Sequence, residues 1–191
     1  AKHLAEKLCA YFLGSAGDAW VQPTAKAYLE SRGDIRAMLR PILKSSELLS
    51  SPPILKRPFD YMVSAMRALD AETDGGSALQ EHLSKMGEPL YQWPMPDGYP
   101  TRTASWTGTM LPRWNFALAL AGNRIGGTNV DWHALLPAPE PERLFELTHA
   151  ARPEPEDREL FHRVDAELKQ EEDGRQTAGF LCLASPKFQW R

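Results

Sequence analysis

The stretch MGEPLYQWPMPDGYPTRTASWTGTMLPRWNFALALAGN, residues 86–123, carries most of the fold prediction. It begins at the end of one expected helix, continues as a long loop rich in proline and aromatic residues, and leads into a second helix over about 109–121. That second helix is apolar on nearly every side, so we expect neighbours to bury it all round, with Trp114 and Phe116 in the core. Pro112 fits its first turn, where a backbone N–H has no partner within the helix.

Helical spacing recurs along the rest of the chain, and the alternation typical of strands is almost absent. Gly14 predicts the end of a first helix that buries Leu4 and Tyr11 on one face. Pro23 predicts the start of a second helix, and Asp34 predicts an N-cap. The expected helices cover about 2–13, 23–32, 35–43, 58–69, 77–86, 109–121, 132–136, 140–150, 155–170 and 175–184. We therefore predict an all-α fold, an irregular multi-helix bundle with a long Pro/Trp-rich loop, forming a single helical domain over 1–191.

Composition excludes several classes of protein. With 191 residues, 42% hydrophobic and 25% charged, the chain is long enough for one stable core. Its net charge of −3 argues against nucleic-acid binding, and no apolar run approaches the roughly 18 residues that a membrane-spanning helix needs. Cys9 and Cys182 lie in apolar helical stretches, where free thiols behave as small buried hydrophobes.

Residues 70–81, DAETDGGSALQE, are the best candidate for a metal site. Asp70, Glu72 and Asp74 fall at the first, third and fifth positions of a calcium-binding loop, and Glu81 falls at the twelfth. Ala78 offers no ligand at the ninth position, and a glutamate at the third is longer than usual. We favour an acidic connection between helices and predict neither a metal nor a cofactor, with a calcium-stabilised loop as the alternative.

The loop over residues 88–107, here called the aromatic loop, contains the candidate ligand contacts. One interpretation is a binding site, in which the rings stack on a sugar or grip a peptide and the arginines bind a carboxylate. The favoured interpretation is structural, with the rings burying the loop on the core and Arg113 and Asn115 bonding to its backbone. The candidate binding residues, in the loop and the following helix, are Trp93, Asp97, Tyr99, Arg102, Trp106, Arg113 and Asn115.

Six segments, in order along the chain, resemble the C-terminal part of a large bacterial family known as domain of unknown function 1800. They are KHLAEKLCAYFLG (2–14), GDIRAMLRPILKSSEL (33–48), LKRPFDYMVSAMRALD (55–70), MGEPLYQWPMPDGYP (86–100), TMLPRWNFALAL (109–120) and LCLASPKFQWR (181–191). The resemblance implies that this chain is the C-terminal fragment of a longer domain. It brings no established activity and therefore no catalytic residue. Where relatives commonly have Gly-Trp after the loop prolines, this chain has Gly98-Tyr99.

Members of that family are often exported and often encoded beside another uncharacterised, sulfatase-like exported family. The resemblance alone therefore implies a location in the periplasm or cell envelope. We predict a helical binding or assembly module whose aromatic loop contacts a co-encoded exported protein or an envelope polymer. The alternative is a hydrolase acting on an envelope polymer. Its site would be shared with the missing N-terminal half, with Asp97 and the arginines as first candidates.

Overall fold

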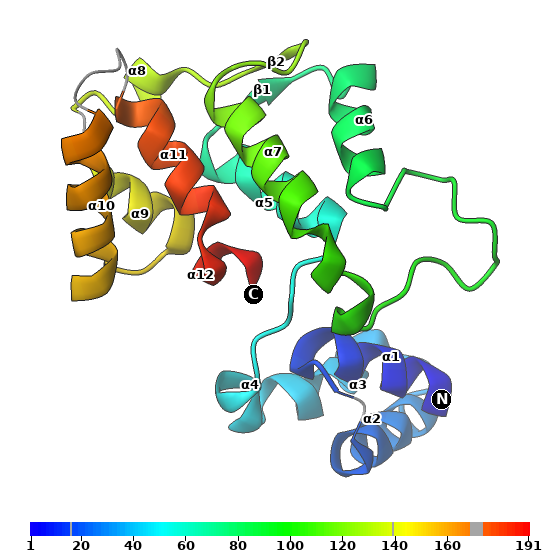
Figure 1. The fold of residues 1–191 in the computed structure, drawn as a ribbon. Coiled ribbons are helices and arrows are strands. Elements are labelled where there is room, and N and C mark those ends of the chain that lie inside the picture. Colours follow the sequence, from blue (N-terminus) through cyan, green and yellow to red (C-terminus); the bar gives the residue numbers. More distant parts are fainter. Residues whose placement is uncertain (16, 139, 169–173) are drawn as a thin grey trace. The chain divides into compact units, whose positions relative to one another are not determined.

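Helices make up nearly all the regular structure that the computed structural model describes, which is residues 1–15, 17–138, 140–168 and 174–191 (Figure 1). The prediction of an all-α fold is confirmed. Within this fold the chain forms two compact units, Ala1–Ile54 and Leu55–Arg191, and the single helical domain expected over 1–191 stays a prediction. Each unit is described by itself below.

Unit 1 (Ala1–Ile54) is a small helical cluster in which α1, α2 and α3 pack against one another. Gly14 ends α1 with a φ of 71°, a conformation that suits glycine, and the Asp34 carboxylate accepts a 2.8 Å hydrogen bond from the Arg36 N–H at the start of α3. Both features were predicted. The helices are α1 (Lys2–Leu13), α2 (Asp18–Glu30), α3 (Ile35–Leu43) and α4 (Glu47–Ser50).

Two details of the unit 1 prediction are wrong. Leu4 and Tyr11 are 40% and 57% exposed, and the buried face of α1 instead presents Ala5 and Cys9, because small side chains allow α2 and α3 to approach closely. Helix α2 begins at Asp18, so Pro23 lies inside it. The lost backbone hydrogen bond is offset by the complete burial of Val21 in the core of unit 1.

Unit 2 (Leu55–Arg191) is built around the contact between α7 and α11, with α5, α6, α9 and α12 packed on this pair. Its elements are α5 (Pro58–Ala68), β1 (Glu72–Thr73), α6 (Ser77–Lys85), η1 (Thr103–Ser105), η2 (Thr107–Thr109), α7 (Met110–Ala121), β2 (Thr128–Asn129), α8 (Trp132–Leu135), α9 (Pro141–His149), α10 (Pro155–Leu168), α11 (Gly174–Ala184) and α12 (Pro186–Gln189). Positions 169–170 of the helix predicted over 155–170 lie outside the described residues. None of the described helices has both the length and the apolar character needed to cross a membrane.

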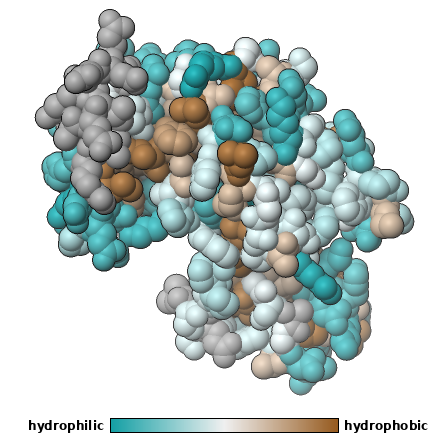
Figure 2. All heavy atoms as spheres, in the orientation of Figure 1, coloured by the Kyte–Doolittle hydropathy of each residue, from teal (hydrophilic) through white to brown (hydrophobic). Residues whose placement is uncertain are grey.

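Helix α7 is less buried than its composition predicts. Phe116 and Leu120 are buried against the neighbouring helices, but Leu111 is 64% exposed and Trp114 is 44% exposed. The prediction that Trp114 is a core residue is therefore wrong. Trp114 lies on a face of α7 that the helices burying Phe116 do not cover. Figure 2 shows that hydrophobic residues reach the surface of the protein in several small areas among hydrophilic ones.

The acidic segment 70–81 contains one strand of a short two-stranded sheet. Strand β1 pairs antiparallel with β2, with Thr73 opposite Thr128. The Asp74 carboxylate accepts a 2.7 Å hydrogen bond from the Gly76 N–H, and the Glu81 carboxylate pairs with the Lys85 ammonium at 2.8 Å. In the described parts of the chain, no three His, Cys, Asp or Glu side chains come close enough together to hold a metal.

Candidate functional site

The aromatic loop has an internal framework of three rings. The ring centroids of Trp93 and Tyr99 are 4.8 Å apart, and those of Tyr99 and Trp106 are 6.3 Å apart. Each ring also donates a hydrogen bond within the loop: Trp93 Nε1 to the Asp97 carboxylate at 3.0 Å, Tyr99 Oη to the Pro89 carbonyl, and Trp106 Nε1 to the Pro100 carbonyl at 2.9 Å. The structure thus brings four of the candidate residues together, with their polar groups already satisfied.

Two buried side chains attach this loop to the body of unit 2. Trp106 is only 4% exposed and closes the end of the loop before α7. At the other end, the Glu88 carboxylate accepts a 2.8 Å hydrogen bond from the Phe59 N–H at the start of α5 and lies 3.5 Å from the Arg57 guanidinium. Burial raises the pKa of Glu88, while the Phe59 N–H and the Arg57 charge act in the opposite sense. Sequence reasoning missed Glu88, because its partners Arg57 and Phe59, at the start of α5, are about 30 residues earlier in the chain.

The tip of the aromatic loop is exposed. Tyr91 is fully exposed and has a φ of 59°, and Met95 is 59% exposed. Neither was among the candidate binding residues. Figure 1 shows the loop as a long excursion from the helices of unit 2, between α6 and α7. The loop therefore presents an exposed tyrosine and methionine on a framework of packed rings.

Arg113 lies away from the loop surface, in the interior of unit 2, and is completely buried. Its Nη2 donates to the Lys56 carbonyl at 2.7 Å, its Nη1 to Gln189 Oε1 at 3.2 Å, and its Nε to Thr109 Oγ1 at 3.0 Å. This guanidinium joins segments far apart in the chain. By contrast, Arg102 and Asn115 are exposed, so the structure does not gather all seven candidates into one site.

Tyr61 completes this buried polar cluster beneath α7. Its hydroxyl lies 3.1 Å from the Leu183 carbonyl and 3.3 Å from the Arg113 carbonyl, and the Arg113 guanidinium lies 5.2 Å from the Tyr61 ring centroid. Gln189 Nε2 also donates to the Leu183 carbonyl at 2.9 Å. Burial raises the pKa of Tyr61. All these contacts are internal, which makes the cluster a structural junction.

A histidine and a serine meet near the C-terminal end of α9. His149 Nε2 lies 3.0 Å from Ser185 Oγ, and the imidazole stacks on the Phe145 ring with centroids 4.0 Å apart. The Ser185 hydroxyl donates to the Cys182 carbonyl at 2.9 Å and accepts from the Phe188 N–H at 3.2 Å. Because its proton is already donated to a carbonyl, Ser185 acts here as a helix cap rather than as an activated nucleophile.

The environment of His149 predicts a loss of stability in acid. Burial lowers the pKa of His149, and the charges of Lys56 and Lys187 act in the same sense. The Phe145 carbonyl and Asp157 oppose this shift without cancelling it. The unfolded chain therefore binds a proton near pH 6.5 that the folded chain takes up only at lower pH, so stability falls as the pH drops below about 6.5.

This expectation is checked with urea midpoints measured between about pH 7.5 and pH 5. His149→Gln should flatten the decline, and the same substitution at the exposed His133 serves as the control. His82 should account for part of the remaining slope, because burial lowers its pKa too. An unchanged slope in His149→Gln would contradict the prediction.

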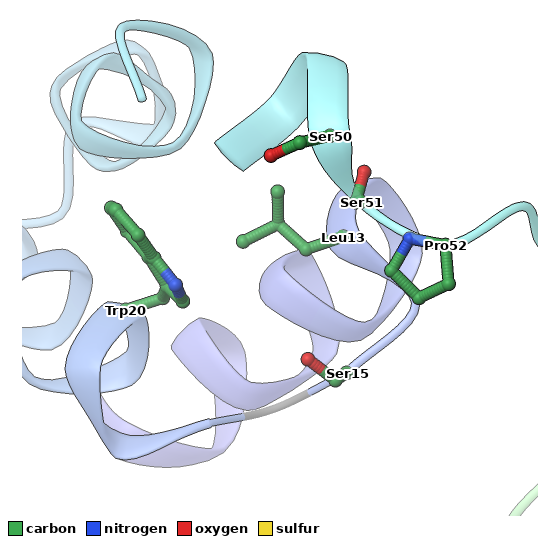
Figure 3. Close-up of a pocket in the computed structure, with 6 residues that line it drawn as sticks. All are labelled: Leu13, Ser15, Trp20, Ser50, Ser51 and Pro52. Atoms are coloured by element: carbon green, nitrogen blue, oxygen red, sulfur yellow. The ribbon is translucent and has the colours of Figure 1, made fainter. Parts of the chain in front are cut away.

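Two surface hollows in the described part of the chain are large enough for a small ligand. In unit 2, a hollow of about 270 Å³ is lined by Leu55, Thr107, Met110, Trp114, Ala184, Pro186, Gln189 and Trp190. In unit 1, one of about 250 Å³ is lined by Leu13, Ser15, Trp20, Ser50, Ser51 and Pro52 (Figure 3). The Ser51 hydroxyl donates to the Leu48 carbonyl at 2.9 Å. Among the described residues that line the two hollows, none has a charged side chain that would select a ligand.

The fold and these contacts define an all-α protein with an ordered aromatic loop and a buried arginine junction. Comparison with known proteins adds its family. The chain matches the family described as protein of unknown function (DUF1800) over residues 1–190, and it belongs to that family. No curated protein and no solved structure matches it significantly.

Proposed function

We propose that this chain is a binding module of an exported protein and that the tip of the aromatic loop contacts a protein partner. The proposal rests on a contrast within the loop. The indole N–H groups of Trp93 and Trp106 donate hydrogen bonds inside the loop, whereas Tyr91 and Met95 are exposed at its tip. Tyrosine supplies contact area at low entropic cost, and methionine adapts to irregular surfaces. A loop already held in one conformation also loses less entropy on binding.

The same geometry favours a protein over an envelope polymer as the partner. Sugar sites commonly use several open aromatic faces, whereas the rings of Trp93 and Tyr99 pack against each other, and the exposed tip pairs a single open ring, Tyr91, with a methionine. The hydrolase alternative stays a prediction. Asp97, its first candidate acid, accepts a hydrogen bond from Trp93 and so contributes to the loop framework.

Site-specific photocrosslinking in the native cell tests this proposal directly. A photoreactive phenylalanine analogue replaces Tyr91 in the full-length protein, and the same analogue at the exposed Tyr11 of unit 1 is the control. We expect a discrete protein adduct from position 91 that is absent from position 11. Adducts shared by both positions, or none from position 91, would refute the proposal. A product encoded beside this protein would be the expected partner.

Loss of the exposed pair should weaken binding without unfolding the chain. With the partner identified by crosslinking, Tyr91→Ser/Met95→Ser is expected to raise the Kd about tenfold or more, as removal of central contact residues does. The free energy of unfolding should change by less than about 0.5 kcal/mol, because Tyr91 is fully exposed and Met95 is mostly exposed. Calorimetry of the complex and urea denaturation of the free protein measure the two quantities. The matched control, Leu29→Ser on exposed unit 1 surface, should change neither.

A further inference from the structure

The hollow in unit 2 lies where α12 and the residue that follows it meet the start of α7 (Figure 1). Two tryptophans line it, Trp114 on α7 and Trp190 after α12, and they are 44% and 39% exposed. The backbone at Trp190 is fixed, because this residue forms a β-bridge with Leu55. Beside the bridge, the Lys56 N–H donates to the Gln189 carbonyl at 2.8 Å. The hollow is therefore a preformed, largely apolar site with indole surface open to solvent.

The polar groups at this hollow include hydrogen-bond donors without partners. Neither the Trp114 nor the Trp190 indole N–H has a partner among the described residues. By contrast, the indole N–H groups of Trp106 and Trp132 each donate to a backbone carbonyl at 2.9 Å. Helix α7, which begins at the lining residue Met110, has no capping side chain and no acidic residue in its first turn. These donors and the positive end of the helix dipole both favour a ligand group that accepts hydrogen bonds and carries negative charge.

Positive charge lies close to the hollow, although none of the described residues that line it is charged. Gln189, a lining residue, accepts a 3.2 Å hydrogen bond from the completely buried Arg113 guanidinium. The other two hydrogen bonds of Arg113 also go to neutral oxygen atoms. Lys56 follows the lining residue Leu55 and is only 9% exposed. Within the described residues neither Lys56 nor Arg113 forms an ion pair.

The carboxylates in this part of unit 2 are paired elsewhere. Asp60 and Glu88 lie 3.7 Å and 3.5 Å from the Arg57 guanidinium. Arg191 adds a charge of the same sign near Lys56. Burial lowers the pKa of Lys56 to about 8, but at pH 7 most of these ammonium groups still carry their charge. Because buried positive charge without a paired carboxylate is costly, an anion in the hollow would be bound favourably.

We propose that this hollow binds a small aromatic carboxylate. The ligand ring packs on the two indoles, since aromatic pairs are favourable in offset and edge-to-face arrangements. Its carboxylate accepts from an indole N–H in the neighbourhood of Arg113 and Lys56. The volume of about 270 Å³ suits a molecule of one or two fused rings. The site contains neither Tyr91 nor Met95, so the inference is independent of the proposed function of the loop tip.

The experiment titrates the folded full chain with naphthoate at pH 7 and follows the indole N–H signals by heteronuclear NMR. We expect a Kd below about 1 mM, with shifts in the signals of Trp114 and Trp190. The signal of Trp132, which bonds to the carbonyl at the other end of α7, should stay in place. Tryptophan-to-phenylalanine variants assign the signals. Absence of binding, or shifts confined to other tryptophans, would overturn the proposal.

Two comparison ligands test the charge and the ring separately. Naphthamide has the same rings without the charge, and we expect it to bind at least about fivefold more weakly than naphthoate. Decalin carboxylate keeps the charge but has no aromatic ring, and it should also bind more weakly. Equal or tighter binding of the amide would overturn the choice of an anion. Equal or tighter binding of the saturated acid would overturn the choice of an aromatic ligand.

Substitutions locate the site on the protein. Trp114→Ala should weaken naphthoate binding at least about fivefold. The control Leu118→Ala, at a 45% exposed position of the same helix outside the hollow, should leave it unchanged. Lys56→Gln should lower the preference for naphthoate over naphthamide at least about twofold, and Lys56→Arg should retain it. Circular dichroism and urea midpoints check that each variant is folded. Unchanged affinity in Trp114→Ala, or unchanged preference in Lys56→Gln, would overturn the proposal.

Discussion

An Arg113→Met variant is expected to lower the free energy of unfolding of unit 2 by about 2–4 kcal/mol, because buried acceptors lose their hydrogen-bond donor. Methionine retains much of the side-chain volume but supplies no donor. Truncation therefore leaves the Lys56 carbonyl and Gln189 Oε1 without the hydrogen bonds that Arg113 donates. A buried acceptor left unpaired costs about 1–3 kcal/mol, and Thr109 Oγ1 loses a partner as well.

Urea denaturation followed by tryptophan fluorescence and circular dichroism measures this loss. Arg113→Lys should fall between wild type and Arg113→Met, because a single ammonium cannot reproduce the fork that reaches three acceptors. Arg102→Met, at an exposed arginine of the same unit, is the matched control and should change stability by less than about 0.5 kcal/mol. Comparable losses in Arg102→Met and Arg113→Met would contradict a junction centred on Arg113.

Helix ends could be predicted well where their signals are local. Gly14 ends a helix through its own backbone conformation and Asp34 caps one through its own side chain, so neighbouring residues suffice. The buried face of a helix is different, because it depends on which elements pack against it. Tyr11 in α1 and Trp114 in α7 look like core residues by composition, yet both are exposed in this structure.

The candidate site shows the same division between local and long-range information. The density of rings between α6 and α7 favoured a loop whose rings are buried on the core, whereas only Trp106 among the tryptophans and tyrosines of residues 88–107 is buried. Which rings pack together and which stay exposed depends on hydrogen bonds such as Trp106 to Pro100, which composition does not encode. The Arg113 junction was harder still to predict from the sequence. Lys56 and Gln189 are far apart in the chain, and no local motif links either of them to Arg113.

A Gly179→Ala substitution should reverse the usual effect of replacing a glycine within a helix. In α11 the change would ordinarily stabilise the helix by about 1 kcal/mol. Here the added Cβ would overlap Cη2 of Trp132 and would lie 3.0 Å from its Cζ2. The indole has little freedom to move, because its Nε1 donates a 2.9 Å hydrogen bond to the Ala121 carbonyl. Overpacking of this kind costs about 1–3 kcal/mol, so after the helix gain of about 1 kcal/mol we expect a net loss of about 1 kcal/mol.

Gly174→Ala is the control on the same helix, because an added Cβ there meets no atom of the described residues within 4 Å. Its effect should be neutral or slightly stabilising, so urea denaturation of the two alanine variants should give stability changes of opposite sign or clearly different size. Trp132→Leu removes the overlapping atoms, and in that background Gly179→Ala should cost much less than in the wild type. An additive double-mutant cycle would contradict the contact, since only coupled residues give an interaction free energy.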